Sequence, residues 1–321
     1  MTPSFPIRRR PDVPRKPSVA APSSAVVIGG AGFIGSHLVD RLLDNDVAVD
    51  VIDDFTTGSL ANLAEARARG ARLSIQQLDA AAPELSTLLE RRTPEVLYLS
   101  RGLGSDARQP LLAVEALAVL VACLEAVRSV SPKSKVVAVL PASQVYGEIP
   151  LRDLPVREDH ERTPVTVSGI IANSMLDVLA GYRDRHAVEY TALVMPTVYG
   201  TRMRPESNVV AAALAARDTG SGFMLHGDGR QTRDLLWIDD AVDALVRAAG
   251  KGGGLALNIG TGVQTSVRDI WRAIGAGVPA TDAPKRTHHV SRVALSAARA
   301  RLHLGWSSFT SVDEGLARLL G

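Results

Sequence analysis

Three glycines, at positions 29, 32 and 35, stand where a short apolar run ends and an amphipathic pattern begins. In a strand–turn–helix unit, glycines at this spacing allow a sharp turn, a close approach of backbone to a pyrophosphate, and tight helix–strand packing. The N-terminus of the helix then offers free N–H groups and partial positive charge to an anion. The segment 29–35, which includes Phe33 and Ile34, is therefore predicted to bind a dinucleotide.

An acidic residue supports this prediction and selects the dinucleotide. Asp53 ends the next apolar run, 48–52, and lies eighteen residues after Gly35. An acid at this place suits the 2′-hydroxyl of a ribose and repels a 2′-phosphate, so NAD is predicted rather than NADP. The alternative is an ordinary glycine-rich turn, which the combination of strand, helix and distant acid disfavours.

The elements that must position these residues form an alternating pattern. As far as residue 200, strand-like runs alternate with helical patterns, which predicts a Rossmann-like doubly wound parallel sheet with right-handed crossovers. Beyond Gly200 the units become shorter. We therefore expect an α/β protein with a dinucleotide-binding domain over 25–200 and a smaller substrate lobe mainly over 201–321. The expected strands are 25–28, 48–52, 73–78, 95–99, 136–140, 188–195 and 255–259, and the main helices 84–91, 111–130, 168–186, 209–218, 241–249, 267–275 and 312–320.

The composition is that of a soluble globular protein, with 46% apolar and 22% charged residues. Every apolar run is shorter than the roughly 18 residues of a membrane span, so no membrane partner is expected. Cys123 is the single cysteine, which excludes internal disulfides and a zinc site built on cysteines. We predict no metal site, a reducing cytoplasm, and a Cys123 that is simply a small buried residue of a helix.

The basic charge is concentrated before residue 25. Residues 1–24 hold five basic residues, one acid and six prolines, a net charge of +4 against +2 for the whole chain, which leaves −2 for the rest. The folded part therefore lacks the basic footprint of a nucleic-acid-binding protein. The first 24 residues are predicted to be a disordered arm and have no apolar core of a secretory signal.

Further motifs follow in a fixed order and carry a family resemblance. The chain resembles the extended short-chain dehydrogenases/reductases, specifically the NAD-dependent sugar-nucleotide epimerases and dehydratases, from Ala25 to Gly321. The resemblance implies a Rossmann half that binds NAD and a C-terminal lobe that grips a nucleotide diphosphate. Besides the glycine turn, it rests on the segments 52–58, Leu78-Asp79, Val145-Tyr146-Gly147, Val198-Tyr199-Gly200, 227–234, 258–262 and 304–306.

In the cofactor half, the resemblance assigns the adenosine ribose to Asp53 and the adenine to Asp79. Two positions depart from the family pattern. Arg101 stands where a small residue normally faces the pyrophosphate. This arginine either pairs with phosphate or obstructs the groove. The helix position that usually holds an asparagine on the ribose side falls on Glu115 or a neighbour.

In the C-terminal lobe, the resemblance places diphosphate contacts at Asn208, Arg233 and Arg286. Arginine suits this role because its planar guanidinium donates two parallel hydrogen bonds to phosphate. The alternative for Arg233 is an ion pair with Asp234 or Asp228.

The catalytic positions break with the family. Its members use a tyrosine as the base and a lysine four residues later that lowers the pKa of the tyrosine. Aligned on Thr163-Pro164, the two positions fall on Val165 and Gly169, and none of the five lysines of the chain follows a tyrosine at this spacing. The family's hydroxyl helper falls on Ala142, next to Ser143.

Two interpretations remain open. The protein is an atypical enzyme that uses substitute groups on a nucleotide-sugar-like ligand, with Ser143, Tyr146 and Ser168 as candidate catalytic residues; or it is a catalytically inactive family member that serves as a binding or regulatory subunit. Tyr146 has a structural alternative, because the family keeps this tyrosine for packing, and Ser168 has one as a helix cap. The resemblance also implies a homodimer in which the helices 111–130 and 168–186 pair with their symmetry mates.

Overall fold

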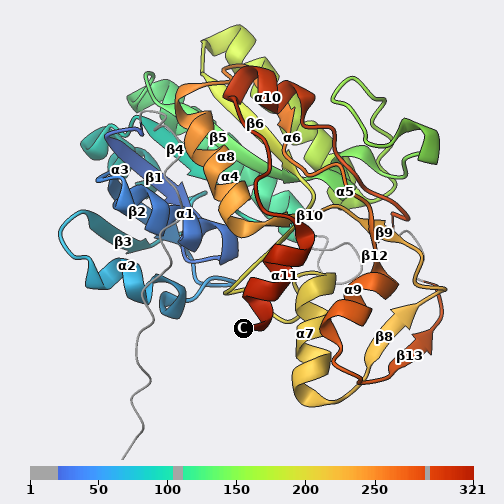
Figure 1. Ribbon diagram of the computed structural model, residues 1–321. Helices are drawn as coiled ribbons and strands as arrows, with labels where there is room; N and C mark the ends of the chain where they lie inside the picture. The colour runs from blue at the N-terminus through green and yellow to red at the C-terminus, as the bar shows by residue number, and fades with distance from the viewer. Residues whose placement is uncertain (1–20, 104–110, 286–289) are drawn as a thin grey trace, which may run out of the picture.

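The computed structural model describes residues 21–103, 111–285 and 290–321, and its centre is a seven-stranded parallel sheet (Figure 1). The strand order is β11-β6-β5-β4-β1-β2-β3, and every neighbouring pair runs parallel. This order confirms the predicted doubly wound α/β fold. The strands are β1 (Ser24–Ile28), β2 (Ala48–Asp53), β3 (Leu73–Gln77), β4 (Val96–Leu99), β5 (Lys135–Pro141), β6 (Tyr190–Met195) and β11 (Leu255–Asn258).

Helices cover both faces of the sheet, and the alternation of side chains along the strands explains how. Successive strand residues point to opposite faces, so Val27 packs in one hydrophobic core and its neighbour Val26 in the other. The first core lies under α1 (Phe33–Asp44), α2 (Ala64–Ala68) and α8 (Ile238–Gly250). The second lies under α3 (Glu84–Arg92), α4 (Leu111–Val130) and α6 (Val167–His186).

A smaller unit is built from the C-terminal part of the chain, at the lower right of Figure 1. There Phe223 of β8 and Trp271 of α9 stack with ring centroids 4.8 Å apart. The chain also returns to the large unit, because α8 packs on α1 and β11 pairs with β6. The smaller unit consists of α7 (Val209–Thr219), β8 (Phe223–His226), α9 (Val267–Ile274) and β13 (Ala280–Ala283).

Short elements complete the described part of the chain. Among the strands are the parallel pair β7 (Thr197–Tyr199) and β10 (Leu235–Trp237) and the antiparallel pair β9 (Thr232–Arg233) and β12 (Thr265–Ser266). The helices are α5 (Ala142–Tyr146), α10 (Ala298–Leu304) and α11 (Val312–Leu320), with two 3₁₀ turns at Leu60–Leu63 and Leu151–Asp153. Of these short elements, the sequence pattern predicted helix α11. Strands of two or three residues could not be predicted, because they leave no periodic signal.

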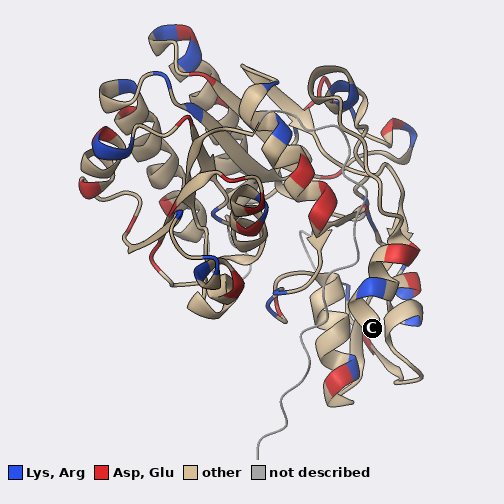
Figure 2. Cartoon of the chain, turned by 60° about the vertical axis from the view of Figure 1, so that its left-hand side comes forward, with Lys and Arg blue, Asp and Glu red and all other residues tan. Residues whose placement is uncertain are grey.

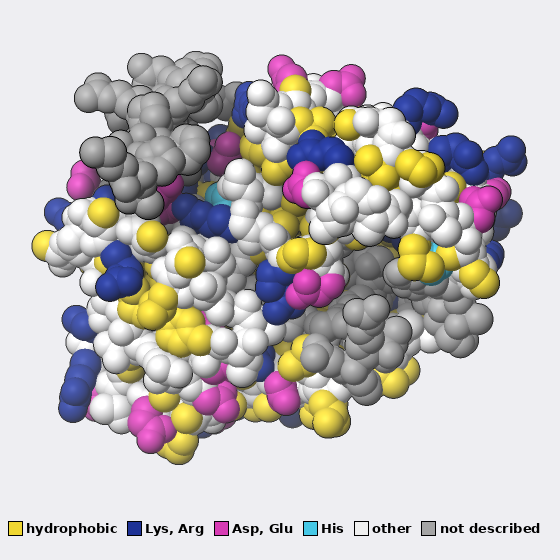
Figure 3. Space-filling model, turned by 90° about the horizontal axis from the view of Figure 1, so that it is seen from below, with side chains coloured by type: hydrophobic (Ala, Val, Ile, Leu, Met, Phe, Trp, Pro, Cys, Tyr) yellow, Lys and Arg dark blue, Asp and Glu magenta, His cyan; other side chains and the backbone are white. Residues whose placement is uncertain are grey.

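Charged residues lie mainly on the outer helices and loops, while the strands of the sheet are mostly uncharged (Figure 2). On the face seen from below, basic and acidic side chains are interspersed over the described part of the surface (Figure 3). Cys123 is fully buried in α4, as predicted. No helix within the described ranges has the length and apolarity to cross a membrane.

Some apolar residues of α4 are exposed. Helix α4 is apolar on nearly every side, yet Leu111 is 72% exposed and Val114 is 50% exposed. Ile170 of the adjacent helix α6 is 57% exposed as well. Helices α4 and α6 pack against each other, and the exposed apolar residues Leu111, Val114 and Ile170 are together called the uncovered apolar strip.

Candidate cofactor and nucleotide-sugar site

The glycine turn has a backbone that only glycine can provide at two positions. Gly29 has φ +73° and donates its N–H to the carbonyl of Ile52 at 2.8 Å. A Cβ on Gly35 would lie 2.2 Å from the carbonyl oxygen of Gly29, so a side chain there would force the helix away from the turn. Gly32 is the N-cap of α1 and offers no capping side chain, which leaves the positive end of the helix open to an anion.

Asp53 holds the turn from the end of β2. Its Oδ2 accepts the N–H of Ala31 at 2.9 Å and its Oδ1 accepts the N–H of Phe55 at 2.9 Å. Burial raises the pKa of Asp53, and these two hydrogen bonds oppose the shift. A carboxylate has about four acceptor sites, so Asp53 keeps acceptor capacity for a ribose hydroxyl. The residues present therefore fit a dinucleotide at this edge.

Asp79, the predicted adenine contact, follows β3 next along the sheet. It is exposed, and its Oδ1 accepts the N–H of Ala81 at 2.9 Å. Asp53 and Asp79 therefore lie at the carboxyl ends of neighbouring strands, where an open α/β sheet binds its ligand. That the two residues contact a cofactor stays a prediction.

Arg101 is held by two carboxylates. Its Nη1 lies 2.8 Å from Oδ2 of Asp54 and its Nη2 lies 3.1 Å from Oε2 of Glu115. The sequence predicted that Arg101 either pairs with phosphate or obstructs the groove, and it did not identify Asp54 as the partner of this arginine. The second acid directly after Asp53, at the end of the strand beside the glycine turn, could have indicated such an ion pair.

The three candidate catalytic residues lie in different surroundings. Ser143 is exposed in the first turn of α5, directly after β5. Tyr146 is 2% exposed, and its hydroxyl donates a 2.7 Å hydrogen bond to Oδ1 of Asn258. Ser168 is fully buried in the first turn of α6. The hydrogen bond ties Tyr146 to the end of β11, and both roles of this tyrosine stay predictions.

The start of α6 fixes where Val165 and Gly169 lie, the two positions that the resemblance assigns to the family's catalytic pair. Thr166 is the N-cap, and its Oγ1 accepts the N–H of Gly169 at 3.1 Å. Val165 therefore lies before the helix, and Ser168 and Ala172 are the first pair four residues apart that is fully buried within it. The alignment on Thr163-Pro164 could not reveal the register of Ser168 and Ala172 on the helix. The first residue of α6 becomes known only from the structure, where Thr166 is the N-cap.

At Gly169 the packing leaves no room for a side chain. A Cβ on this residue would lie 2.8 Å from the carbonyl oxygen of Gln144 in α5, 3.0 Å from Cβ of Pro164 and 3.1 Å from Oγ1 of Thr166. Ala142, at the position of the hydroxyl helper, is 1% exposed.

In the C-terminal lobe, the predicted diphosphate residues are partly engaged by their own chain. Asn208 is the N-cap of α7: its Oδ1 accepts the N–H of Ala211 at 3.0 Å, and its Nδ2 donates to the carbonyl of Val198 at 3.0 Å. Arg233 donates from Nη1 to the carbonyl of Thr232 at 2.7 Å. Arg286 lies outside the described residues.

Asp234, which follows Arg233 in the sequence, accepts hydrogen bonds from two distant loops. This buried carboxylate accepts hydrogen bonds from the backbone of Thr261, Gly262 and Leu295 and from the hydroxyl of Thr261, at 2.7–3.0 Å. Burial raises the pKa of Asp234, and the same hydrogen bonds oppose the rise. Asp234 thus joins three segments of the C-terminal half into one loop cluster.

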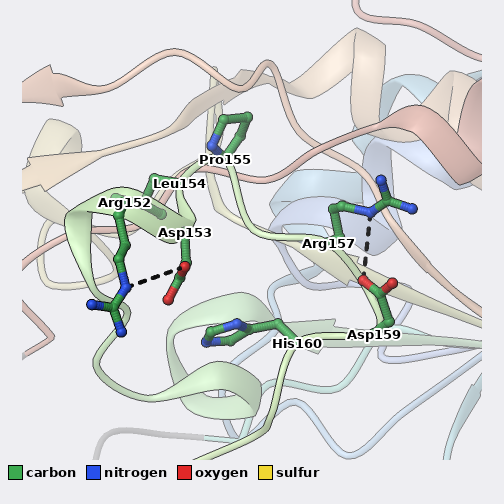
Figure 4. A pocket seen from close by; sticks show the side chains of 7 residues that line it. All are labelled: Arg152, Asp153, Leu154, Pro155, Arg157, Asp159 and His160. Carbon is green, nitrogen blue, oxygen red and sulfur yellow. Dashed lines mark ion pairs between the residues drawn. The ribbon is translucent and has the colours of Figure 1, made fainter.

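A pocket of about 460 Å³ opens on the loop after α5. Two ion pairs border it, Arg152 with Asp153 and Arg157 with Asp159 (Figure 4). His160 also lines the pocket, and its ring centroid lies 6.5 Å from that of Tyr146. None of the residues that line it belongs to the glycine turn. The pocket is therefore separate from the candidate cofactor site.

Known proteins resemble this chain in sequence and in fold. Over 306 residues the chain is 35% identical to the UDP-glucose 4-epimerase of Mycolicibacterium smegmatis, which covers 91% of this chain and 96% of the relative. The crystal structure of the Thermotoga maritima UDP-glucose 4-epimerase with UDP-glucose superposes with a TM-score of 0.85 at 26% identity, covering 92% of this chain and 97% of that one. The Bacillus cereus UDP-glucuronic acid 4-epimerase, in complex with UDP-glucuronic acid and NAD, gives a TM-score of 0.81 at 26% identity, with 92% and 98% covered.

A family model matches residues 25–260, from the first strand of the sheet past its last. The match includes the glycine turn, Asp53 and both helices of the uncovered apolar strip. It confirms the predicted family and its cofactor: the chain belongs to the NAD dependent epimerase/dehydratase family.

Proposed function

We propose that this protein binds NAD and a nucleotide-sugar ligand but does not run the tyrosine–lysine hydride relay of its family. One observation carries the proposal: no lysine of the chain follows a tyrosine at a distance of four residues, although the glycine turn and Asp53 are intact. General acid–base catalysis contributes roughly 10²–10⁴ in rate. The loss of the base together with the group that activates it is therefore expected to reduce the relay to background.

The packing around α6 supports the proposal. A lysine at Gly169 would overlap the carbonyl of Gln144, and Val165 precedes the helix. The alternative register on the helix, Ser168 with Ala172, supplies neither a phenol nor an ammonium group. In both registers the chain lacks a side chain that could take the proton of a sugar hydroxyl as an activated phenolate does.

The proposed binding roles follow the two halves of the site. NAD supplies a nicotinamide ring that accepts and returns hydride. Asp53 would hold the adenosine ribose, and the N-terminus of α1, open at Gly32, would face the pyrophosphate. Arg233 and Asn208 would contact the diphosphate of the sugar nucleotide, as they also cap and brace their own segments.

A second function rests on Ser143. Its hydroxyl is exposed at the carboxyl end of β5, next to the position of the missing helper. A serine there suits non-redox chemistry, which needs no tyrosine base for hydride transfer, on a nucleotide-sugar-like ligand bound at the same site. The protein would then be an atypical enzyme rather than an inactive binding subunit.

Calorimetry and turnover measurements separate these functions. The purified full chain is titrated with NAD and with UDP-glucose, and then incubated with UDP-glucose or UDP-glucuronic acid and NAD; the Mycolicibacterium smegmatis relative is the positive control. Binding with no 4-epimer formed is the expected result. Epimer formation at the rate of the relative would overturn the proposal. A product other than the epimer that disappears in the Ser143→Ala variant would favour the second function.

We further propose a homodimer formed through the uncovered apolar strip of α4 and α6. Leu111, Val114 and Ile170 are half or more exposed although they belong to the two longest helices, which the resemblance pairs across a two-fold axis. Burial of such residues contributes about 25 cal/mol per Å² of apolar surface. A symmetric partner would give these side chains the contact that the single chain does not provide.

A further inference from the structure

Arg101, Asp54 and Glu115 form a compact cluster at the carboxyl edge of the sheet. The guanidinium is 2.8 Å from Asp54 and 3.1 Å from Glu115, and the side chains of Arg101 and Asp54 are only 19% and 21% exposed. Glu115 belongs to α4, while the other two residues follow strands. The cluster therefore ties three separate elements together.

The position of the cluster relative to the glycine turn follows from the strand order. Arg101 follows β4 and Asp54 follows β2, and β1 lies between these two strands. A Cβ on Gly29 would lie 3.3 Å from the backbone nitrogen of Arg101, so the arginine rests directly on the first residue of the turn. The ion pair with Asp54 must then cross the carboxyl end of β1, where a dinucleotide enters a doubly wound sheet.

The backbone before Arg101 is fixed. The hydroxyl of Ser100 donates to the carbonyl of Ile28 at 2.9 Å, and the N–H of Ser100 bonds to the same carbonyl at 3.1 Å. The arginine therefore starts from an anchored residue, and only its side chain can leave the crevice.

The charges of the cluster do not favour an incoming phosphate. Two carboxylates surround one guanidinium, so the three residues sum to −1. Against the effect of partial burial, hydrogen bonds from Thr56 and Arg101 lower the pKa of Asp54, and the bonds to Asp54 and Glu115 raise that of Arg101. Each terminal nitrogen of the guanidinium therefore already has a carboxylate partner, Asp54 for Nη1 and Glu115 for Nη2.

From this geometry we propose that Arg101 is a bar across the dinucleotide crevice, which the cofactor must displace from Asp54 and Glu115 before its adenosine half can settle against Asp53. The inference rests on the proposed binding of NAD. Its consequence is a protein that binds NAD more weakly and more slowly than its glycine turn alone would allow. Two partly exposed ion pairs of ordinary strength correspond to roughly a tenfold loss in affinity.

The test is calorimetry and stopped-flow binding of NAD to the full chain. Arg101→Ala is expected to bind NAD about tenfold more tightly, with faster association, and Glu115→Gln, which removes one of the two ion pairs, should fall between this variant and the wild type. Arg128→Ala is the matched control, because Arg128, on α4, is also an ion-paired arginine and is bound to Glu125. The affinity of this variant for NAD should equal that of the wild type. Thermal melting of each variant checks that the fold is retained.

The outcomes separate the inference from the proposed function. If Arg101→Ala binds NAD more weakly than the wild type, Arg101 is a phosphate ligand and the bar is overturned; equal affinities overturn it as well. If neither the wild type nor any folded variant binds NAD, the proposed binding function itself fails. Tighter binding by Arg101→Ala and intermediate binding by Glu115→Gln together establish the bar.

Discussion

The hydroxyl of Tyr146 donates a hydrogen bond to the side chain of Asn258, 112 positions later in the chain. Asn258 is itself fixed, because its N–H donates to Glu158 and its Nδ2 donates to the carbonyl of Val156. Tyr146 thus joins α5 to the end of β11, the last strand to enter the sheet. The hydrogen bond therefore connects two elements that are far apart in sequence, and burial raises the pKa of Tyr146.

Replacing Tyr146 by Phe should therefore lower stability. The substitution leaves the buried Oδ1 of Asn258 without its donor, a loss of about 1–3 kcal/mol in the free energy of unfolding. Urea denaturation measures the effect. Tyr182→Phe is the control, because the Tyr182 hydroxyl bonds to the half-exposed Glu125, and a change within about 0.5 kcal/mol is expected there. An unchanged stability of Tyr146→Phe would contradict this structural role of the hydroxyl.

Two glycines of α6 should respond in opposite ways to alanine. At Gly169 the new methyl group would meet the carbonyl of Gln144 at 2.8 Å, whereas at Gly181 a Cβ has nothing within 4 Å. Gly169→Ala should lower the free energy of unfolding by about 1–3 kcal/mol through overpacking. Gly181→Ala should raise it by about 0.5–1 kcal/mol, because alanine loses less backbone entropy in a helix. Equal effects at both positions would contradict the tight packing of α6 on α5.

The same packing predicts that a tyrosine and a lysine cannot be accommodated at Val165 and Gly169. A Val165→Tyr, Gly169→Lys double variant places the tyrosine before the helix and forces the lysine against α5. We expect it to unfold at lower temperature than the wild type and to form no 4-epimer from UDP-glucose. Recovery of the rate of the Mycolicibacterium smegmatis relative would show that α6 moves to accept the pair.

Asp240 should give the protein a distinctive pH dependence. This buried residue of α8 accepts the N–H of Phe309 at 2.5 Å, and burial raises its pKa from 3.8 to about 6. Between these two pH values the folded chain binds a proton that the unfolded chain does not. Its contribution to the free energy of unfolding therefore falls as the pH rises through this window, by at most about 1.4 kcal/mol per pH unit.

The measurement is urea unfolding of the wild type and Asp240→Asn over the range from pH 4 to pH 7. The difference between the two, wild type minus variant, should decrease up to about pH 6 and level off above it. Asn keeps the acceptor for Phe309 and cannot titrate, so the contributions of the other carboxylates cancel. A difference that does not depend on pH would show that Asp240 keeps an ordinary pKa.

The apolar strip on α4 and α6 should decide the oligomeric state. Ile170→Glu introduces a charge in the proposed interface, at a residue that is 57% exposed in the single chain. Light scattering should then show a dimer for the wild type and a monomer for the variant, with the fold unchanged. Leu302→Glu is the control: Leu302 is 78% exposed on α10, outside the strip, and this variant should remain dimeric. A monomeric wild type would overturn the proposed interface.

Much of the fold could be predicted because its signals are local. A parallel sheet covered on both faces needs continuous apolar strands, and these stand out between helical patterns: the predicted helix 111–130 and the last helix, 312–320, have the observed bounds. The short strands β7 to β10 could not be predicted in the same way. They exist only because distant segments, such as β7 and β10, lie side by side in the folded chain.

The sequence by itself determined the parallel sheet, the glycine turn, the acid at its end and the absence of a tyrosine–lysine pair, because each of these depends on residue type and spacing along one stretch of chain. Tertiary structure alone decided what the polar groups of the site do: Arg101 meets Asp54 and Glu115, Tyr146 meets Asn258, and Gly169 faces a carbonyl of α5. The physical reason is that hydrogen bonds and ion pairs act over about 3 Å. Their partners are fixed only when strands and helices far apart in sequence have packed.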